Sequence, residues 1–218
     1  MQPFDKLTAV AAPIDVPNVD TDQIAPARFL RRPREEGYSD ILFHDVRKMP
    51  DGSLRPDFVL NQTAFRDAGI LVADRNFGGG SSREQAVWAL VDSGIRCVIA
   101  VSFGDIFYNN SVKHGLLLVR VGAETAKSLR GELHARPGAT MSVDLEAQTF
   151  TTPSGETVAF EIEPSRKRRL SLGLDDIELT LQHESEIAAF EERYRARKGW
   201  LFDAVRSVNS QRSDSSLR

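Results

Sequence analysis

The stretch from Asn76 to Glu84 constrains this chain more than any other. It reads Asn-Phe-Gly-Gly-Gly-Ser-Ser-Arg-Glu, follows the apolar run Ile70–Ala73 and precedes a segment with helical spacing from Gln85 to Val91. Three consecutive glycines let a backbone turn tightly between a strand and a helix. Free N–H groups and the helix dipole favour an anion at the start of that helix. The sequence therefore predicts a strand, a glycine loop and a helix whose first turn can bind an anion beside a hydroxyl.

A capped helix start is the competing interpretation of the same stretch. Ser81 and Glu84 have the spacing of a capping box, and so do Ser82 and Gln85 one residue later. Capping explains the serines, but it explains neither the three glycines before them nor Arg83 after them. The stretch is not a Walker P-loop, because no lysine follows the glycines, and it lacks the glycine spacing of a Rossmann fingerprint. On the motif alone, both interpretations stay open.

The apolar runs predict an α/β fold. A second run, Arg96–Ser102, follows the helix directly, so two parallel strands and a helix form a βαβ unit. Cys97 lies inside this run, where a cysteine is a core residue rather than a ligand or nucleophile. Other strands are expected at 4–11, 116–119, 141–145, 149–151 and 157–162, the last two as a hairpin, and helices within 103–115 and at 125–134, 163–172 and 184–205.

Composition limits the class of protein. The chain has 218 residues, of which 41% are hydrophobic and 27% charged, as in one soluble globular domain. A net charge of −3 without a long basic run argues against a nucleic-acid partner. No apolar run approaches the ~18 residues of a membrane span, and the N-terminus has no signal-peptide core. One cysteine cannot form an internal disulfide, which fits a reducing cytoplasm.

The glycine loop resembles the signature of the swivelling domain of the aconitase superfamily. Three further segments resemble that family in the same order, namely 17–30 with Asn-Val-Asp-Thr-Asp-Gln-Ile, 105–110 with Asp-Ile-Phe-Tyr-Asn-Asn, and 173–183. Within the superfamily, the chain is most similar to the small subunits of 3-isopropylmalate dehydratases. This resemblance implies a swivelling domain over 1–206, with a mostly parallel central sheet flanked by helices and a small β-hairpin region. Residues 207–218, rich in Ser and Arg, are predicted to be a disordered tail.

The resemblance also implies roles for single residues. Ser81 would be the catalytic base, acting as an alkoxide, and Ser82 with Gln85 would then cap the helix. Ser82 and Arg83 would hold a substrate carboxylate. Thr21 and Asp22 would lie near the bound substrate. A supporting set would surround the loop, consisting of Asn76, Gly78, Gly79, Gly80, Asn109 and Asn110.

The charged segment 28–48 is predicted to be a mobile loop, since it has no period and contains Pro33 and Gly37. Arg31, Arg32 and Arg34 are good carboxylate ligands, although a solvated charge run is the simpler explanation of this segment on its own. The resemblance implies that this loop helps to select the side chain of the substrate.

An iron–sulfur cluster of the aconitase type needs several thiolates, and this chain has only Cys97. Its four histidines show no metal spacing. The resemblance places the 4Fe-4S cluster on a separate large subunit, with this chain closing over the active site in a heterodimer or larger assembly. It implies reversible dehydration of a hydroxy dicarboxylic acid in leucine biosynthesis, with the cluster iron polarising the leaving hydroxyl.

Two positions depart from the family pattern, which usually has Cys where Gly79 stands and His where Gln85 stands. The departures leave the substrate open among isopropylmalate and the substrates of related hydro-lyases acting on citraconate, maleate or homoaconitate. A third hypothesis, from another class, is a non-catalytic module that binds phosphate at the glycine loop. The missing P-loop lysine argues against it.

Overall fold

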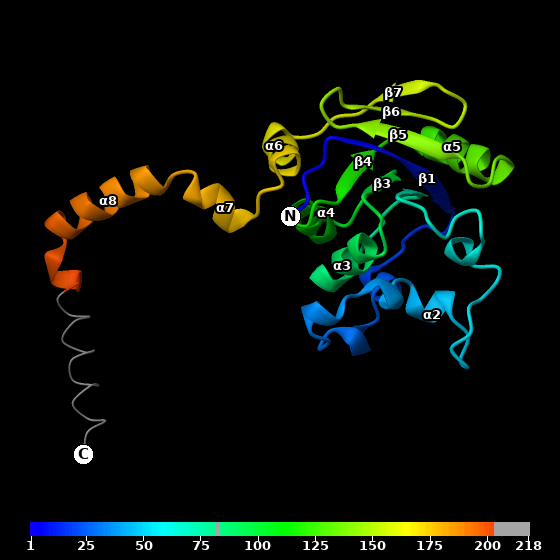
Figure 1. Ribbon diagram of the computed structural model, residues 1–218, viewed down its shortest axis with the longest axis horizontal. Helices are drawn as coiled ribbons and strands as arrows, with labels where there is room; N and C mark the ends of the chain where they lie inside the picture. Colours follow the sequence, from blue (N-terminus) through cyan, green and yellow to red (C-terminus); the bar gives the residue numbers. More distant parts are fainter. Residues whose placement is uncertain (82, 203–218) are drawn as a thin grey trace, which may run out of the picture. The chain divides into compact units, whose positions relative to one another are not determined.

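The structure is a computed structural model that describes residues 1–81 and 83–202 (Figure 1). The chain divides into two compact units, Met1–Asp175 and Asp176–Arg218. This division falls inside the range 1–206, which the sequence predicts to be one domain. The first unit contains a seven-stranded sheet with the strand order β4-β3-β2-β1-β5-β6-β7.

The strands are β1 (Lys6–Ile14), β2 (Ile70–Ala73), β3 (Cys97–Ala100), β4 (Leu117–Arg120), β5 (Thr140–Asp144), β6 (Thr149–Thr151) and β7 (Thr157–Ala159). The α-helices are α1 (Thr21–Ile24), α2 (His44–Arg47), α3 (Glu84–Asp92), α4 (Asp105–Lys113), α5 (Ala123–Ala135), α6 (Pro164–Leu172), α7 (Asp176–Leu181) and α8 (Glu184–Arg197). Short 3-10 turns are η1 (Ala27–Phe29), η2 (Arg34–Glu36), η3 (Ser39–Ile41) and η4 (Val59–Asn61). None of the described helices is long and apolar enough to cross a membrane.

Strand β1 joins two kinds of sheet. Its first half pairs antiparallel with β5, from Lys6 opposite Asp144 onward, and its second half pairs parallel with β2. The pairs β2–β3 and β3–β4 are parallel, whereas β5–β6 and β6–β7 are antiparallel. The predicted α/β class is confirmed, but the sheet is mixed rather than mostly parallel. The first strand also runs past the predicted end at Ala11, because Pro13 lacks only the amide donor and still pairs in register with Val72.

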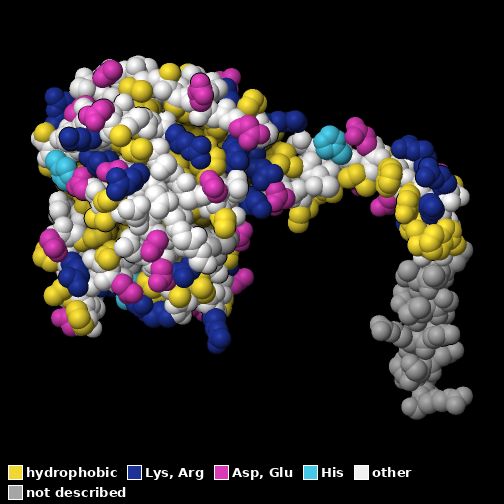
Figure 2. All heavy atoms as spheres, turned by 180° about the vertical axis from the view of Figure 1, so that it is seen from behind, with side chains coloured by type: hydrophobic (Ala, Val, Ile, Leu, Met, Phe, Trp, Pro, Cys, Tyr) yellow, Lys and Arg dark blue, Asp and Glu magenta, His cyan; other side chains and the backbone are white. Residues whose placement is uncertain are grey.

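Two hydrophobic cores lie on the two faces of the sheet. Leu71 and Ala73 of β2 join one core with α3 and residues 38–43, while Ile70 and Val72 join the other with α5 and α6. Alternate strand residues point to opposite faces, so a strand covered on both sides is apolar throughout. In Figure 1, α2 and α3 lie on one side of β1, and β5–β7 lie on the other. Acidic and basic side chains are interspersed over the face of the first unit in Figure 2.

The described part of the second unit contains α7, α8 and helical residues at 199–202. The predicted helix over 184–205 is interrupted at Lys198, whose φ of −129° lies outside the helical range. Neither α7 nor α8 contains a buried residue. The predicted tail, 207–218, and the last residues of the predicted helix lie outside the described residues.

Candidate active site

The glycine loop leaves the carboxyl end of β2 and turns over α4. Gly78 has a φ of +71°, and a Cβ on it would overlap the ring of Phe107. A Cβ on Gly79 would approach the side-chain amide of Asn76 to 2.9 Å. Glycine is therefore required at 78 by both backbone conformation and space, and it is favoured at 79 by space.

The segment after β1 anchors this loop from the other side. Gly78 N donates to Val19 O at 2.7 Å, and Thr21 N donates to Gly79 O at 2.9 Å. The Thr21 hydroxyl donates to Ser81 O at 2.8 Å. Thr21 is buried, whereas Ser81 is exposed. Thr21, predicted to lie near the substrate, thus fixes the backbone of Ser81 and leaves the Ser81 side chain open to solvent.

Arg83 is held by Asp22, as part of the same contact between the two segments. Arg83 Nη1 donates to Asp22 Oδ1 and, at 3.4 Å, to Ala25 O. The Arg83 side chain is 15% exposed and that of Asp22 is 57% exposed. Asp22 Oδ1 also accepts from Ala27 N at 2.8 Å. The hydrogen bond from Arg83, helped by that amide, holds the pKa of Asp22 below its ordinary value, so this carboxylate is ionised at neutral pH.

Helix α3 begins without the predicted capping box of Ser81 and Glu84. Its N-cap is Arg83, which has an extended backbone and makes no side-chain cap bond. Gln85 donates instead to Leu30 O at 3.4 Å, across to the segment after β1. The predicted cap and carboxylate contact of Ser82 lie outside the described residues. The first N–H groups of α3 thus receive no cap from their own N-cap residue, which suits an anion at this helix start.

The supporting residues divide into two groups. Asn76 has a φ of +56°. Its backbone N–H donates to Ser102 Oγ at 2.8 Å, and its side-chain Nδ2 donates to Asn18 Oδ1 at 3.2 Å. It therefore ties together the loops that follow β1, β2 and β3. Asn109 instead accepts from Arg166 at 2.9 Å, in a groove of about 1010 Å³.

Among the described residues, neither Asn109 nor Asn110 hydrogen-bonds to the glycine loop, which differs from the prediction. Phe107 of the same helix supplies the contact, by filling the space over Gly78. Two features of the sequence could have predicted this contact: a glycine directly after β2 and an aromatic residue on the apolar side of α4. Periodicity places Phe107 on the buried side of α4, away from the exposed Asn109.

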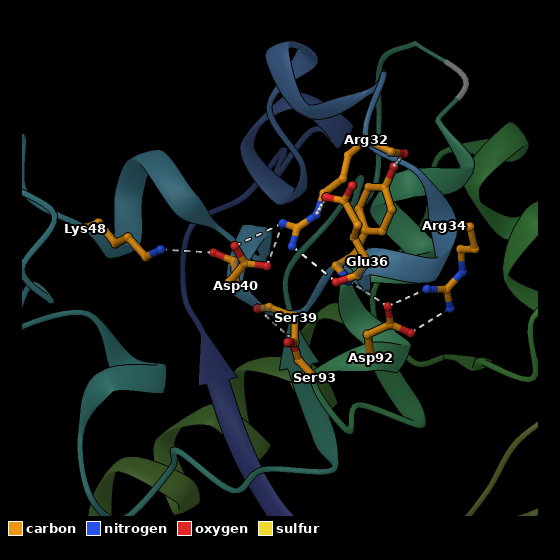
Figure 3. Close-up of polar contacts among 9 residues, drawn as sticks. Arg32, Arg34, Glu36, Ser39, Asp40, Lys48, Asp92 and Ser93 are labelled. Carbon is orange, nitrogen blue, oxygen red and sulfur yellow. Dashed lines mark hydrogen bonds and ion pairs between the residues drawn. The ribbon is translucent and has the colours of Figure 1, made fainter.

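Two of the three predicted substrate arginines are paired within the fold (Figure 3). Arg34 binds both oxygens of Asp92, at 2.6 and 2.7 Å. Arg32 donates to both oxygens of Asp40, at 2.8 and 3.0 Å, and lies 3.3 Å from Glu36. In this structure these two guanidinium groups bind carboxylates of their own chain instead of facing open space.

Tyr38 fastens the same segment to α3. Its backbone N–H donates to Asp92 at 2.8 Å, and its hydroxyl donates to Arg32 O at 2.6 Å. The ring is fully buried, and this burial raises the pKa of the phenol. Arg31 is exposed, and in the described part of the chain its side chain has no hydrogen bond or ion pair. Of the predicted set, Arg31 alone remains available to a ligand from this segment.

The donors of this chain do not fit an iron–sulfur cluster. Cys97 is fully buried in β3, and burial raises the pKa of its thiol. Within residues 1–81 and 83–202, no three His, Cys, Asp or Glu side chains converge where they could hold a metal ion. Cys97 is a core residue, as predicted.

Family models match three successive parts of the chain. An aconitase C-terminal domain matches residues 1–124, and LeuD_N matches 127–164. The C-terminal domain of the 3-isopropylmalate dehydratase small subunit matches 176–204. The 3-isopropylmalate dehydratase small subunit of Afipia carboxidovorans is 50% identical over 201 residues, covering 92% of this chain and 100% of that protein. The same subunit of Paramagnetospirillum magneticum is 49% identical with the same coverage.

A solved structure shows the same fold. The 3-isopropylmalate dehydratase (leuD) of Methanocaldococcus jannaschii superposes with a TM-score of 0.62 at 24% identity, covering 85% of this chain and 99% of that one. This superposition supports the fold alone, whereas the sequence relatives support the family, because they are about half identical over nearly the whole chain. The chain therefore belongs to the family of 3-isopropylmalate dehydratase small subunits, in the aconitase superfamily.

Proposed function

We propose that this chain forms one wall of the active site of a 3-isopropylmalate dehydratase, which interconverts 2-isopropylmalate and 3-isopropylmalate in leucine biosynthesis by losing and re-adding water. One observation carries the proposal. The exposed Ser81 lies two residues before Arg83, the N-cap residue of α3, which makes no side-chain cap bond, and Thr21 binds the backbone of Ser81.

Ser81 acts as the base that removes the proton from the carbon next to the leaving hydroxyl. A serine hydroxyl is ordinarily a poor base, so its ionised form needs support. The start of α3 and the guanidinium of Arg83 both favour an alkoxide. The bond from Thr21 fixes the backbone at Ser81, which limits how far its hydroxyl can move.

Arg83 binds one carboxylate of the substrate. Planar guanidinium groups bind carboxylates through two parallel hydrogen bonds. A dicarboxylate needs a second cationic contact, and the exposed Arg31 is the candidate that the segment after β1 leaves available. Arg34 holds this segment against α3 through Asp92, and Arg32 is paired within the segment with Asp40.

The catalytic cluster belongs to a separate large subunit, because this chain has no thiolate set to hold it. When bound there, the cluster supplies the Lewis acid that the family's chemistry uses. The working unit is then a heterodimer or a larger assembly, and we place it in the cytoplasm.

The test compares the chain alone with the chain reconstituted with its large subunit. Alone, it is expected to show no iron–sulfur absorbance and no turnover of 2-isopropylmalate. In the reconstituted enzyme, Ser81→Ala is expected to lower kcat by about 10²–10⁴, the usual contribution of a positioned base. The melting temperature should change little, because the Ser81 side chain is exposed.

Four outcomes would contradict parts of the proposal. Turnover by the chain alone would overturn the two-subunit arrangement. A Ser81→Ala enzyme with full turnover and a lower melting temperature would make Ser81 structural. A higher kcat/KM for citraconate, maleate or homoaconitate than for isopropylmalate would move the assignment to a related hydro-lyase, and tight phosphate binding by the chain alone would favour a binding module.

A further inference from the structure

The contact between Arg83 and Asp22 uses one nitrogen of the guanidinium only. Nη1 carries two N–H groups, and it has two acceptors, Asp22 Oδ1 and Ala25 O. Nε and Nη2 have no hydrogen-bond partner among the described residues. These two atoms form one of the two edges through which a guanidinium can bind a carboxylate with two parallel bonds.

We infer that Asp22 is a positioning residue, which holds Arg83 by Nη1 and leaves its Nε–Nη2 edge available for the substrate carboxylate. The inference rests on the proposed role of Arg83 as the carboxylate ligand. It gives Asp22 a different task from direct contact with the substrate, because Asp22 acts through Arg83.

The negative charge of Asp22 would by itself weaken anion binding, so its presence beside Arg83 needs another reason. A carboxylate beside an anion-binding arginine repels the incoming anion and neutralises part of its ligand, so its presence there has a cost for binding. Asp22 offsets this cost by fixing the guanidinium of Arg83 before the substrate binds. A long side chain loses rotamer freedom when a ligand immobilises it, and this loss is smaller when the side chain is already held.

Asp22 is itself well fixed. Its Oδ1 accepts from Ala27 N at 2.8 Å, and this bond involves neither Asp20 nor Gln23, which form the capping box of α1. The neighbouring Thr21 binds Ser81 O at 2.8 Å. Two successive residues of α1 thus hold the backbone of the proposed base and the side chain of the proposed carboxylate ligand, respectively.

The experiment is a double-mutant cycle in the enzyme reconstituted with its large subunit. Asp22→Ala is expected to raise KM for 2-isopropylmalate about tenfold, with a smaller effect on kcat, and to have no further effect on kcat/KM in an Arg83→Ala background. Asp22→Asn keeps an oxygen acceptor without the charge, and it should recover most of the loss. Asp22→Glu keeps the charge but displaces the carboxylate by one methylene, so it should raise KM as Asp22→Ala does.

Asp20→Ala is the matched control. It removes the acceptor of the hydrogen bond that Gln23 N donates to Asp20 Oδ1, at 2.7 Å, in the same short helix, and the Asp20 side chain makes no contact with Arg83 among those described. A lower melting temperature with an unchanged KM is expected. If Asp20→Ala raised KM as Asp22→Ala does, Asp22 would act through the stability of α1, and the inference would be wrong.

The remaining outcomes separate this inference from the proposed function. Additive effects of Asp22→Ala and Arg83→Ala would overturn the inference and leave the role of Arg83 standing. A lower KM for Asp22→Ala would show that Asp22 competes with the substrate, which also overturns it. An Arg83→Ala enzyme with unchanged kcat/KM would instead remove Arg83 from the proposed function. If Asp22→Ala fails to assemble with the large subunit, the cycle of Asp22→Glu with Arg83→Ala decides by the same criterion.

Discussion

Two arginine–aspartate pairs stand at the two ends of α3, and they are built differently. At the carboxyl end, Asp92 is the last residue of the helix, and its two oxygens receive two nitrogens of Arg34 at 2.6 and 2.7 Å. At the amino end, Arg83 gives one nitrogen to Asp22. In the pair of Arg34 and Asp92, the carboxylate is the less exposed side chain, at 18%. In the pair of Arg83 and Asp22, the arginine is the less exposed side chain, at 15%.

This difference in hydrogen bonding separates an arginine that stabilises the fold from one that can still bind a ligand. Arg34 has its hydrogen-bonding edge filled by a carboxylate that also binds Tyr38 N, so it stabilises the fold. Arg83 keeps an edge without a partner among the described residues. Asp92 and Arg83 also stand at the unfavourable ends of the helix dipole, an acid at the carboxyl end and a base at the amino end. The charge of Asp92 is neutralised by Arg34 through two hydrogen bonds, whereas that of Arg83 is paired with Asp22 through one nitrogen only. Arg83 can therefore bind a further anion.

The largest effect is expected from exchanging each arginine for lysine in turn. Arg83→Lys should lower kcat/KM for isopropylmalate about 100-fold, because a point charge cannot reproduce a fork and a small misplacement is costly at a reacting site. Arg34→Lys should leave kcat/KM nearly unchanged and lower the urea midpoint. Steady-state kinetics of the reconstituted enzyme and urea unfolding of the isolated chain measure both. Equal kinetic losses would return Arg34 to the set of substrate ligands.

The two aspartates should differ in the opposite sense. Asp92→Asn is expected to lower the free energy of unfolding by about 2 kcal/mol, since it weakens charge-assisted bonds to Arg34 and Tyr38 at a carboxylate that is mostly covered. Asp22→Asn should cost less than about 1 kcal/mol, as exposed pairs usually do. Urea unfolding of the isolated chain gives both values. A loss as large at Asp22 as at Asp92 would mean that the two pairs do not differ as described.

The contrast between these pairs explains how far the sequence could predict the site. The strands β2 and β3 and the glycine loop between them were predicted well, because continuous apolar runs and consecutive glycines are local signals. The partner of Arg34 lies 58 residues away in the sequence, and no local pattern points to it. The same holds for Asp22 and Arg83, which are 61 residues apart. Composition shows three clustered arginines, but only the fold separates the paired ones from Arg31.

The contacts of single side chains were the second feature that the sequence could not supply. The resemblance placed Thr21 near the substrate, and the fold turns its hydroxyl toward the backbone of Ser81. Asn109 and Asn110 were predicted to support the loop because they are polar and belong to a family motif. The loop is supported by Phe107, an apolar neighbour on the buried side of the same helix. Polar residues attract attention in a sequence, whereas close packing against glycine does not.

A moderate effect is expected for Arg31→Ala. This arginine is exposed, and its partner would be the substrate alone, so KM should rise roughly two- to fivefold at low salt. The rise should shrink as ionic strength increases, because exposed charges are screened. The measurement is KM at two salt concentrations, with Arg28→Ala as control, since Arg28 is paired with Asp45. A rise that is independent of salt would indicate a packed contact instead of an exposed charge.

The smallest effect concerns the titration of Asp22. Its pKa in the folded chain lies below the ordinary 3.8, first because Arg83 donates to it and second because of the Ala27 amide. A carboxyl whose pKa is depressed by folding contributes stability above its unfolded pKa and loses it as pH falls through the folded pKa. The contribution of Asp22 is therefore complete at neutral pH and disappears only below about pH 4. Because the carboxylate is 57% exposed, solvent screens it, and the unfolding midpoint should hardly respond.

The titration itself is the sensitive measurement of that pair. Carboxyl NMR of the isolated chain should show Asp22 titrating below 3.8, and Arg83→Ala should move its pKa upward. The return should be incomplete, because the bond from Ala27 N remains in the variant. Arg34→Ala serves as control and should leave Asp22 unaffected, since Arg34 is paired with Asp92 at the other end of α3. An Asp22 pKa that is the same with and without Arg83 would show that the two side chains are not paired in solution. Arg83 would then be as free as Arg31, and the difference between the two ends of α3 would lie in Asp92 alone.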